Sequence, residues 1–146
     1  MRREILLLRH AKSAWDDPSL SDHDRPLSPR GATAVRRLHD QFVRAGHRPD
    51  VVLCSSARRT VDTLDGIRAA LPKRTSIEVS DELYLADADA LLSRVHRLDD
   101  TIRCAVFIGH NPGLEDLAAR LVGSGDDRLR TQLAAKFPTG ALVALS

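Results

Sequence analysis

The hydrophobic pattern of the chain alternates between short apolar runs and longer amphipathic segments. Three runs are almost wholly apolar and are bounded by polar or turn-forming residues, at 5–8, 51–54 and 105–108. Runs of this length predict strands that are buried on both faces of a sheet. A shorter alternation at 77–79 and a final apolar stretch at 141–145 predict two further strands.

Between these strands, apolar residues recur every three or four positions, which predicts helices that pack by one face against the sheet. Each predicted helix follows a residue whose side chain can accept a hydrogen bond from the first turn: Ser28, Ser56, Asp87 and Asn111. Residues 126–136 show a weaker pattern, which we interpret as a loop or a weak helix. The alternation predicts an α/β fold, a three-layer α/β/α sandwich around a mainly parallel sheet, with residues 1–146 forming one domain.

Composition narrows the classes of function. The chain is 42% hydrophobic and 29% charged with a formal net charge of +2, as in ordinary globular proteins, so a nucleic-acid or membrane-surface partner is not expected. Aromatic residues make up only 3%, too few for a platform that stacks nucleic-acid bases. The first apolar run is too short for a signal peptide or a membrane span, so we expect a cytoplasmic protein. Cys54 and Cys104 are expected to be reduced and buried.

The residues that could carry chemistry follow the predicted buried strands. Arg9-His10 ends the first strand, Ser55 follows the second and precedes Arg59, and Gly109-His110 ends the strand at 105–108. The carboxyl ends of parallel strands meet at one edge of a sheet, so these residues should converge there. Histidines, arginines and helix N-termini brought together form a phosphate-binding site.

Three motifs resemble those of the histidine phosphatase superfamily, which includes the phosphoglycerate mutases. They are Arg9-His10, Ser55-x-x-x-Arg59-x-x-x-Thr63 and Gly109-His110. Three further stretches are similar to the short SixA-type phosphohistidine phosphatases: Arg-His-Ala-Lys-Ser at 9–13, Asp-His-Asp-Arg-Pro-Leu at 22–27, and Gly-His-Asn-Pro at 109–112. The resemblance runs from the first strand to at least Leu121 and implies a phosphoglycerate mutase-like fold.

The resemblance also implies a mechanism. His10 would be the nucleophile that forms a phosphohistidine, which water then hydrolyses. Arg9 and Arg59 would hold the phosphoryl oxygens, and a protonated His110 would hold another. Neither a metal ion nor another cofactor is required. Neighbouring cations would keep the His10 lone pair free by disfavouring its protonation.

Other positions have two interpretations or a weaker match to the family. Ser55 is equally suited to bind a phosphate or merely to finish its strand. The mutases use a Glu as general acid, and Glu82 is the best candidate for that role here. Arg25 is expected to hold the entry to the following helix rather than to bind a ligand. Arg58 is expected to point to water.

The sequence therefore predicts a SixA-like phosphatase acting on a phosphorylated protein, such as a histidine-phosphorylated signalling domain, or on a small phosphorylated metabolite. Tyr84 leads to the helix after Asp87 within a few residues, which leaves little chain for a lid, and an open cleft suits a protein substrate. Two alternatives remain. One is a non-catalytic module on the same fold that binds phosphate or phosphoproteins. The weaker one is a metal-dependent hydrolase using His10 and His110, which the adjacent Arg9 disfavours.

Overall fold

A five-stranded sheet forms the centre of the computed structural model, which describes residues 3–122 and 137–145. The strands, in the order β3-β2-β4-β1-β5 across the sheet, are β1 (Glu4–Arg9), β2 (Val51–Ser55), β3 (Ser76–Ser80), β4 (Cys104–Gly109) and β5 (Leu142–Leu145). The first four pair in parallel, and β5 pairs antiparallel with β1. The predicted mainly parallel sheet is confirmed. The prediction for residues 126–136 lies outside the described residues.

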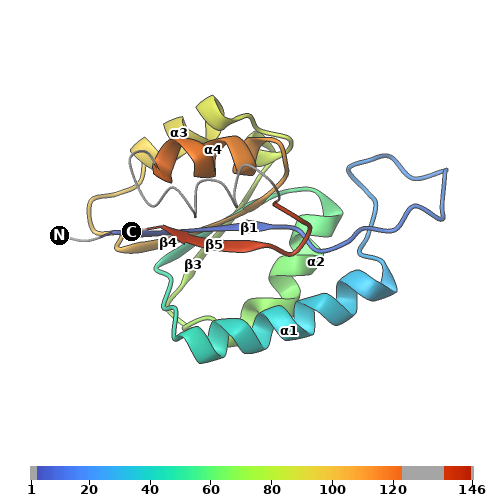
Figure 1. Cartoon of the computed structure of the whole chain (residues 1–146), viewed down its shortest axis with the longest axis horizontal. Helices are drawn as coiled ribbons and strands as arrows, with labels where there is room; N and C mark the ends of the chain where they lie inside the picture. The colour runs from blue at the N-terminus through green and yellow to red at the C-terminus, as the bar shows by residue number, and fades with distance from the viewer. Residues whose placement is uncertain (1–2, 123–136, 146) are drawn as a thin grey trace.

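Helices cover both faces of this sheet (Figure 1). On one face lie α1 (Pro29–Ala45) and α2 (Arg58–Ile67), and on the other lie α3 (Ala88–His96) and α4 (Gly113–Val122). Two short 3-10 helices, η1 (Arg68–Ala70) and η2 (Asp81–Leu83), extend α2 and connect β3 toward α3. The fold is thus the predicted three-layer α/β/α sandwich.

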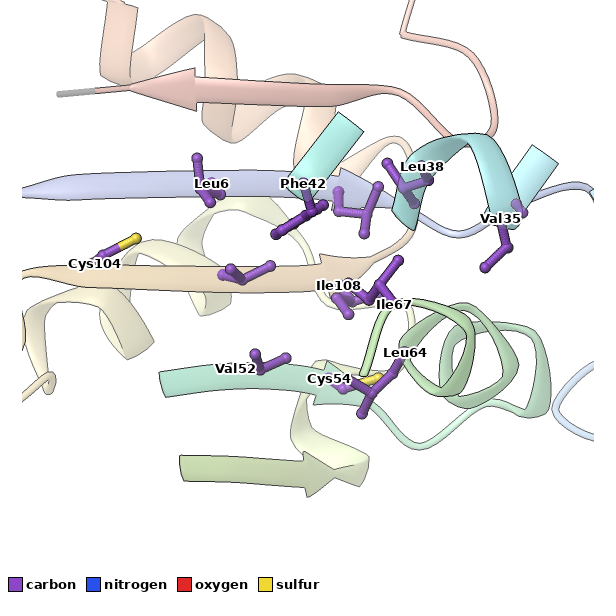
Figure 2. Close-up of a cluster of buried hydrophobic side chains, with 13 residues drawn as sticks. Leu6, Val35, Leu38, Phe42, Val52, Cys54, Leu64, Ile67, Cys104 and Ile108 are labelled. Atoms are coloured by element: carbon purple, nitrogen blue, oxygen red, sulfur yellow. The ribbon is translucent and has the colours of Figure 1, made fainter. Parts of the chain in front are cut away.

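The core between the sheet and the α1–α2 layer is built from aliphatic residues and one phenylalanine (Figure 2). Phe42 of α1 and Leu64 of α2 belong to the same buried cluster as Leu6, Val52 and Ile108 from three neighbouring strands. All five side chains are at most 1% exposed. Complete burial of such a side chain stabilises a fold by about 1.5–3 kcal/mol, so this cluster fixes the strands whose ends carry the candidate site.

Two of the predicted helix starts have the expected capping bond. The Ser28 hydroxyl accepts from the backbone N–H of Gly31 at 3.0 Å, and the Asp87 carboxylate accepts from that of Ala90 at 2.8 Å. Gly31 is also required for close packing, because a Cβ there would lie 2.1 Å from the carbonyl oxygen of Lys12. The start of α1 is therefore seated directly on the chain that follows His10.

The other two capping predictions are wrong. The residue before α2 is Ala57, which makes no side-chain cap, and the Ser56 hydroxyl instead lies 2.9 Å from His23 Nε2. The Asn111 side chain donates to the carbonyl of Phe137 at 2.8 Å, while its own Oδ1 is buried without a partner among the described residues. In both cases a contact with a distant segment replaces the local cap.

Candidate active site

The carboxyl ends of β1, β2 and β4 place the predicted residues at one edge of the sheet. Arg9 is in register with Gly109, so the two histidines that follow these residues leave neighbouring strands side by side. The ring centroids of His10 and His110 are 5.4 Å apart. The segment between β1 and α1, residues 10–28, extends beyond the strand ends at this edge (Figure 1). The predicted convergence of these residues is confirmed.

His10 is held in one tautomer, with its lone pair on Nε2. Its Nδ1 lies 2.7 Å from the carbonyl oxygen of Ala11, and because a carbonyl only accepts, Nδ1 carries the hydrogen. The lone pair is therefore on Nε2, which accepts from Arg59 Nε at 3.3 Å. Burial lowers the pKa of His10 to about 4, and the nearby guanidinium groups of Arg59, Arg9 and Arg25 act in the same direction. At neutral pH the ring is uncharged, as a nucleophile requires.

Arg59 connects the site to the β1–α1 segment. It lies in the first turn of α2 and is only 3% exposed. Its guanidinium donates to the backbone carbonyl of Asp22 at 2.7 Å and to the Asp22 carboxylate at 3.1 Å. The adjacent Arg58 points the other way, as expected: its side chain is 60% exposed and pairs with Asp62 at 3.0 Å. Helix geometry thus sends one of two consecutive arginines into the site and the other to the surface.

His110 is held between Arg59 and Ser55. Its Nδ1 lies 3.3 Å from Arg59 Nη2, and its Nε2 lies 2.7 Å from the Ser55 hydroxyl. A guanidinium has only hydrogens to donate, so Nδ1 accepts and Nε2 carries the hydrogen. Burial, followed by the charge of Arg59, lowers the pKa of His110 to about 3. In this arrangement the ring is neutral, unlike the protonated form expected from the sequence. A bound phosphoryl dianion would shift this pKa upward.

Ser55 is fully buried and lies behind the cleft rather than in its described lining. Its hydroxyl pairs with His110 and also accepts from the backbone N–H of Ala57 at 3.3 Å. The hydroxyl oxygen accepts in both contacts, and the bond from His110 orients the imidazole. Ser55 does finish its strand, one of the two interpretations from the sequence, and its hydroxyl also contacts His110, which neither interpretation included.

A cleft of about 350 Å³ opens around His10. Its charged and imidazole-bearing lining residues are Arg9, His10, Lys12, Arg25, Arg59 and His110, and the rest of its described lining is Ser13, Trp15, Leu85, Asn111 and Thr139. No carboxylate belongs to this described lining, and four of its residues are cations. Arg9 lines the cleft, and its Nη1 donates a hydrogen bond to the carbonyl oxygen of Phe137 at 3.0 Å. Such a lining binds anions with several oxygens, above all phosphate.

Asp22 belongs to the hydrogen-bond network of the site, a position that the sequence reasoning did not assign to it. One carboxylate oxygen accepts from Arg25 at 2.9 Å, and the other accepts from Arg59 and from the Tyr84 hydroxyl. The Tyr84 hydrogen bond, supported by both guanidinium groups, holds the pKa of Asp22 well below its usual range. This carboxylate fixes two cleft arginines. The available signal was the SixA-like stretch 22–27, which contains both Asp22 and Arg25.

Arg25 lies in the cleft lining, although the sequence suggested a role only in the entry to α1. It is 7% exposed and donates to the Ser13 hydroxyl at 2.7 Å and to the carbonyl of Ala14 at 3.3 Å. These bonds do hold the β1–α1 segment. Because the same side chain faces the cleft, it also adds to its positive charge.

The structure does not bring Glu82 into the site. Its carboxylate is exposed and lies 3.4 Å from Arg97, outside the described lining of the cleft. Glu82 lies in η2. Tyr84, two positions later, lies against His110 instead, with 5.5 Å between the ring centroids. Glu82 is therefore not placed to act as the proton donor expected from the sequence.

Two features of the described residues bear on other classes of protein. Within 3–122 and 137–145, no group of three His, Cys, Asp or Glu side chains is placed to hold a metal ion. Of the helices in that part of the chain, none is both long enough and apolar enough to cross a bilayer.

Comparison with known proteins agrees with this geometry. The sequence profile of the Histidine phosphatase superfamily (branch 1) matches residues 5–89, more than half of the chain. An uncharacterised protein of Mycobacterium tuberculosis is 33% identical over 141 residues, which cover 94% of this chain and 85% of that protein. An uncharacterised chloroplast protein of Arabidopsis thaliana is 35% identical over 134 residues, which cover 84% of this chain but only 60% of the Arabidopsis protein.

A crystal structure from Agrobacterium tumefaciens, described provisionally as the phosphohistidine phosphatase SixA, superposes with a TM-score of 0.88. It is 30% identical, and the match covers 99% of this chain and 91% of the Agrobacterium chain. The fold is therefore phosphoglycerate mutase-like, as expected, and phosphatase activity is supported at the level of the superfamily. From its motifs, its fold and these relatives, the chain belongs to the histidine phosphatase superfamily.

Proposed function

We propose that this protein hydrolyses phosphohistidine on a partner protein, or a small phosphomonoester, through a covalent phosphohistidine at His10 and without a metal ion. The observation that carries the proposal is the state of His10. The hydrogen on its Nδ1 is donated to the carbonyl of Ala11, and its lone pair is on Nε2, which lies beside Arg59 in a cationic cleft. A neutral imidazole beside an anion-binding group is equipped to attack phosphorus.

In the first step, the lone pair of His10 Nε2 forms a bond to phosphorus while the bond from phosphorus to the leaving group breaks. The leaving group departs with that electron pair and takes up a proton from solvent water. Arg9 and Arg59 bind the equatorial oxygens, where the charge of the transition state is spread. His110 is the third group within reach of the phosphoryl group, because it lies beside both His10 and Arg59.

In the second step, water attacks the phosphorus of phosphohistidine, and the bond to Nε2 breaks. The electron pair returns to Nε2, and inorganic phosphate leaves. The hydrogen bond from Nδ1 to Ala11 lasts through both steps and stabilises the positive charge that the ring carries while phosphorylated. The two steps consume one water and regenerate His10.

The absence of a carboxylic acid from the described cleft lining supports a phosphorus–nitrogen substrate. An imidazole leaves far more readily than an alkoxide and needs less help from a positioned acid. Phosphohistidine is therefore the substrate that this site could hydrolyse with the groups it has. We place the reaction in the cytoplasm, in keeping with two buried cysteines that are both free thiols.

Replacement of the nucleophile tests the proposal. We expect His10→Ala to lower kcat for hydrolysis of phosphoimidazole and of a histidine-phosphorylated protein by about 10⁶-fold, the scale on which loss of a nucleophile acts in another covalent hydrolase. His39→Ala, which removes a surface imidazole in α1, should leave kcat unchanged. A strong chelator should have no effect on the wild type. Activity that survives in His10→Ala would refute the covalent mechanism.

A further inference from the structure

The cleft carries an exposed indole that the proposed chemistry does not use. Trp15 lies in the β1–α1 segment, is 77% exposed and belongs to the lining of the cleft that contains His10. It is the single tryptophan of the chain. An indole is the side chain with the largest apolar surface and also the best face for stacking, so its place at the opening of a binding cleft indicates a ligand contact.

This indole is fixed in position rather than loosely attached. The guanidinium carbon of Arg25 lies 3.5 Å from the centroid of the Trp15 ring, which is close cation–π stacking. Arg25 is itself held by Ser13, Ala14 and Asp22. One face of the indole thus rests on a buried, well-anchored cation, while most of the remaining surface stays open to the cleft and to solvent.

Leu85 provides a second apolar group at the same cleft. It is 54% exposed and lines the cleft together with Trp15. Its φ of 51° is in the left-handed region, which is disfavoured for a leucine. The preceding residue, Tyr84, donates a hydrogen bond to the Asp22 carboxylate. Asp22 also accepts from Arg25, which stacks on Trp15, so one carboxylate holds a neighbour of each apolar side chain.

We propose that Trp15, seated on Arg25, stacks on the planar ring that carries the phosphoryl group, with Leu85 as a further apolar contact. The inference rests on the proposed function. In-line attack by His10 places the leaving group on the side of phosphorus opposite the imidazole. Trp15 and Leu85 are the exposed apolar side chains of the same cleft that could contact it there. The site is thereby selective for phosphorus bonded to a ring, such as imidazole, over phosphorus bonded to a carrier without one.

A pair of small substrates isolates the contribution of the ring. Phosphoimidazole and phosphoramidate both contain a phosphorus–nitrogen bond, but only the first has a ring. We expect Trp15→Ala to lower the ratio of their kcat/KM values, phosphoimidazole over phosphoramidate, by about tenfold, the size of one lost stacking contact. Trp15→Phe, which keeps a stacking face, should lower it by less than about threefold.

Leu20→Ala is the matched control. Leu20 is also an exposed apolar residue of the β1–α1 segment, at 37%, but lies outside the described cleft lining. The ratio should be unchanged in this variant. An unchanged ratio in Trp15→Ala, whether or not both activities fall together, would overturn the inference.

A binding measurement separates this inference from the proposed function. In His10→Ala, Trp15 is still the only tryptophan, so its fluorescence reports directly on the cleft. We expect phosphoimidazole to change the emission and to bind about tenfold more tightly than phosphoramidate. Equal affinities, or an emission that does not respond, would overturn the stacking role. Failure of the wild type to hydrolyse either compound would instead overturn the proposed function, because the fluorescence titration does not require turnover.

Discussion

The same three strands, β1, β2 and β4, supply two neighbouring regions of opposite chemistry. Along their length they contribute apolar side chains such as Leu6, Val52 and Ile108 to the core shown in Figure 2. At their carboxyl ends they contribute or lead into polar residues that are just as deeply buried, among them Ser55 and His110 at 0% and 4% exposed. Burial is therefore similar in the two regions, but what it accomplishes differs.

In the part of the chain that the structure describes, all buried polar and charged residues lie in the cleft or directly behind it: His10, Ser13, Arg25, Ser55, Arg59, Thr60, Thr63 and His110. The core needs only complementary shapes, and its free energy comes from apolar burial. The cleft depends on hydrogen bonds between its buried polar groups, because an unpaired buried polar group is costly. Three cleft atoms nevertheless lack a partner among the described residues: Arg9 Nε, Arg25 Nε and Asn111 Oδ1. Burial stabilises the fold in the first region and sets pKa values and tautomers in the second.

The two consecutive arginines of α2 give the sharpest test of this difference. We expect Arg59→Gln to lower kcat/KM about 10³-fold, because it removes the buried guanidinium that the proposed mechanism uses to bind the phosphoryl group. Arg58→Gln should change kcat/KM by less than about twofold, since a surface pair such as Arg58–Asp62 contributes little. Steady-state kinetics on phosphoimidazole measure both. Comparable losses in the two variants would show that the cleft does not depend on the buried guanidinium.

Substitutions in the two regions should differ in how their effect on stability depends on pH. Leu64→Ala in the core should lower the free energy of unfolding by about 3 kcal/mol at any pH at which the protein is folded. For His10, the pKa is lowered from 6.5 in the unfolded chain to about 4 in the folded protein. The unfolded state therefore binds more protons between these values, and stability is lost as the pH falls from 6.5 toward 4.

This linkage predicts that His10→Gln is more stable relative to the wild type at pH 5 than at pH 7, by about 1–2 kcal/mol. Urea unfolding at the two pH values gives the comparison, with Leu64→Ala as the reference whose deficit is the same at both. A difference in the free energy of unfolding between His10→Gln and the wild type that is the same at both pH values would contradict the lowered pKa.

Asp22 tests how the cleft is held together. Asp22→Asn keeps the size of the side chain but weakens its bonds to Arg25 and Arg59, so we expect kcat/KM to fall about 30-fold, within the range for residues that support a site. The control is Asp24→Asn in the same segment, where the exposed carboxylate lies 3.5 Å from His23. That variant should stay within about twofold of the wild type. A similar loss from both would indicate a general effect of charge in the segment.

The fold was predictable from the sequence because its signals are local or periodic. The apolar runs at 5–8, 51–54 and 105–108 became β1, β2 and β4, and alternation with helices implied a parallel sheet. His10, Arg59 and His110 could be expected to meet because strand ends in such a sheet share one edge. The start of α1 was also clear, since Ser28 and Pro29 are adjacent to the helix that they begin.

What the sequence could not supply were contacts between distant segments. Ser56 looks like a cap but pairs with His23, and Asp22 looks like a solvated loop residue but holds Arg59, which is 37 residues away. Glu82 was preferred as an acid because of its residue type, yet it faces Arg97 at the surface. In each case the decisive partner lies in another element, and no local propensity encodes it.

The site of phosphorylation is the most direct measure of the central claim, which is that burial and the Ala11 carbonyl leave a nucleophilic lone pair on Nε2 of His10. The protein is mixed with phosphoimidazole, quenched in alkali within milliseconds, digested, and analysed by mass spectrometry and by NMR of the phosphorylated peptide. The account predicts phosphate on Nε2 of His10. Phosphate on Nδ1, phosphate on another residue, or turnover without any phosphorylated intermediate would contradict it.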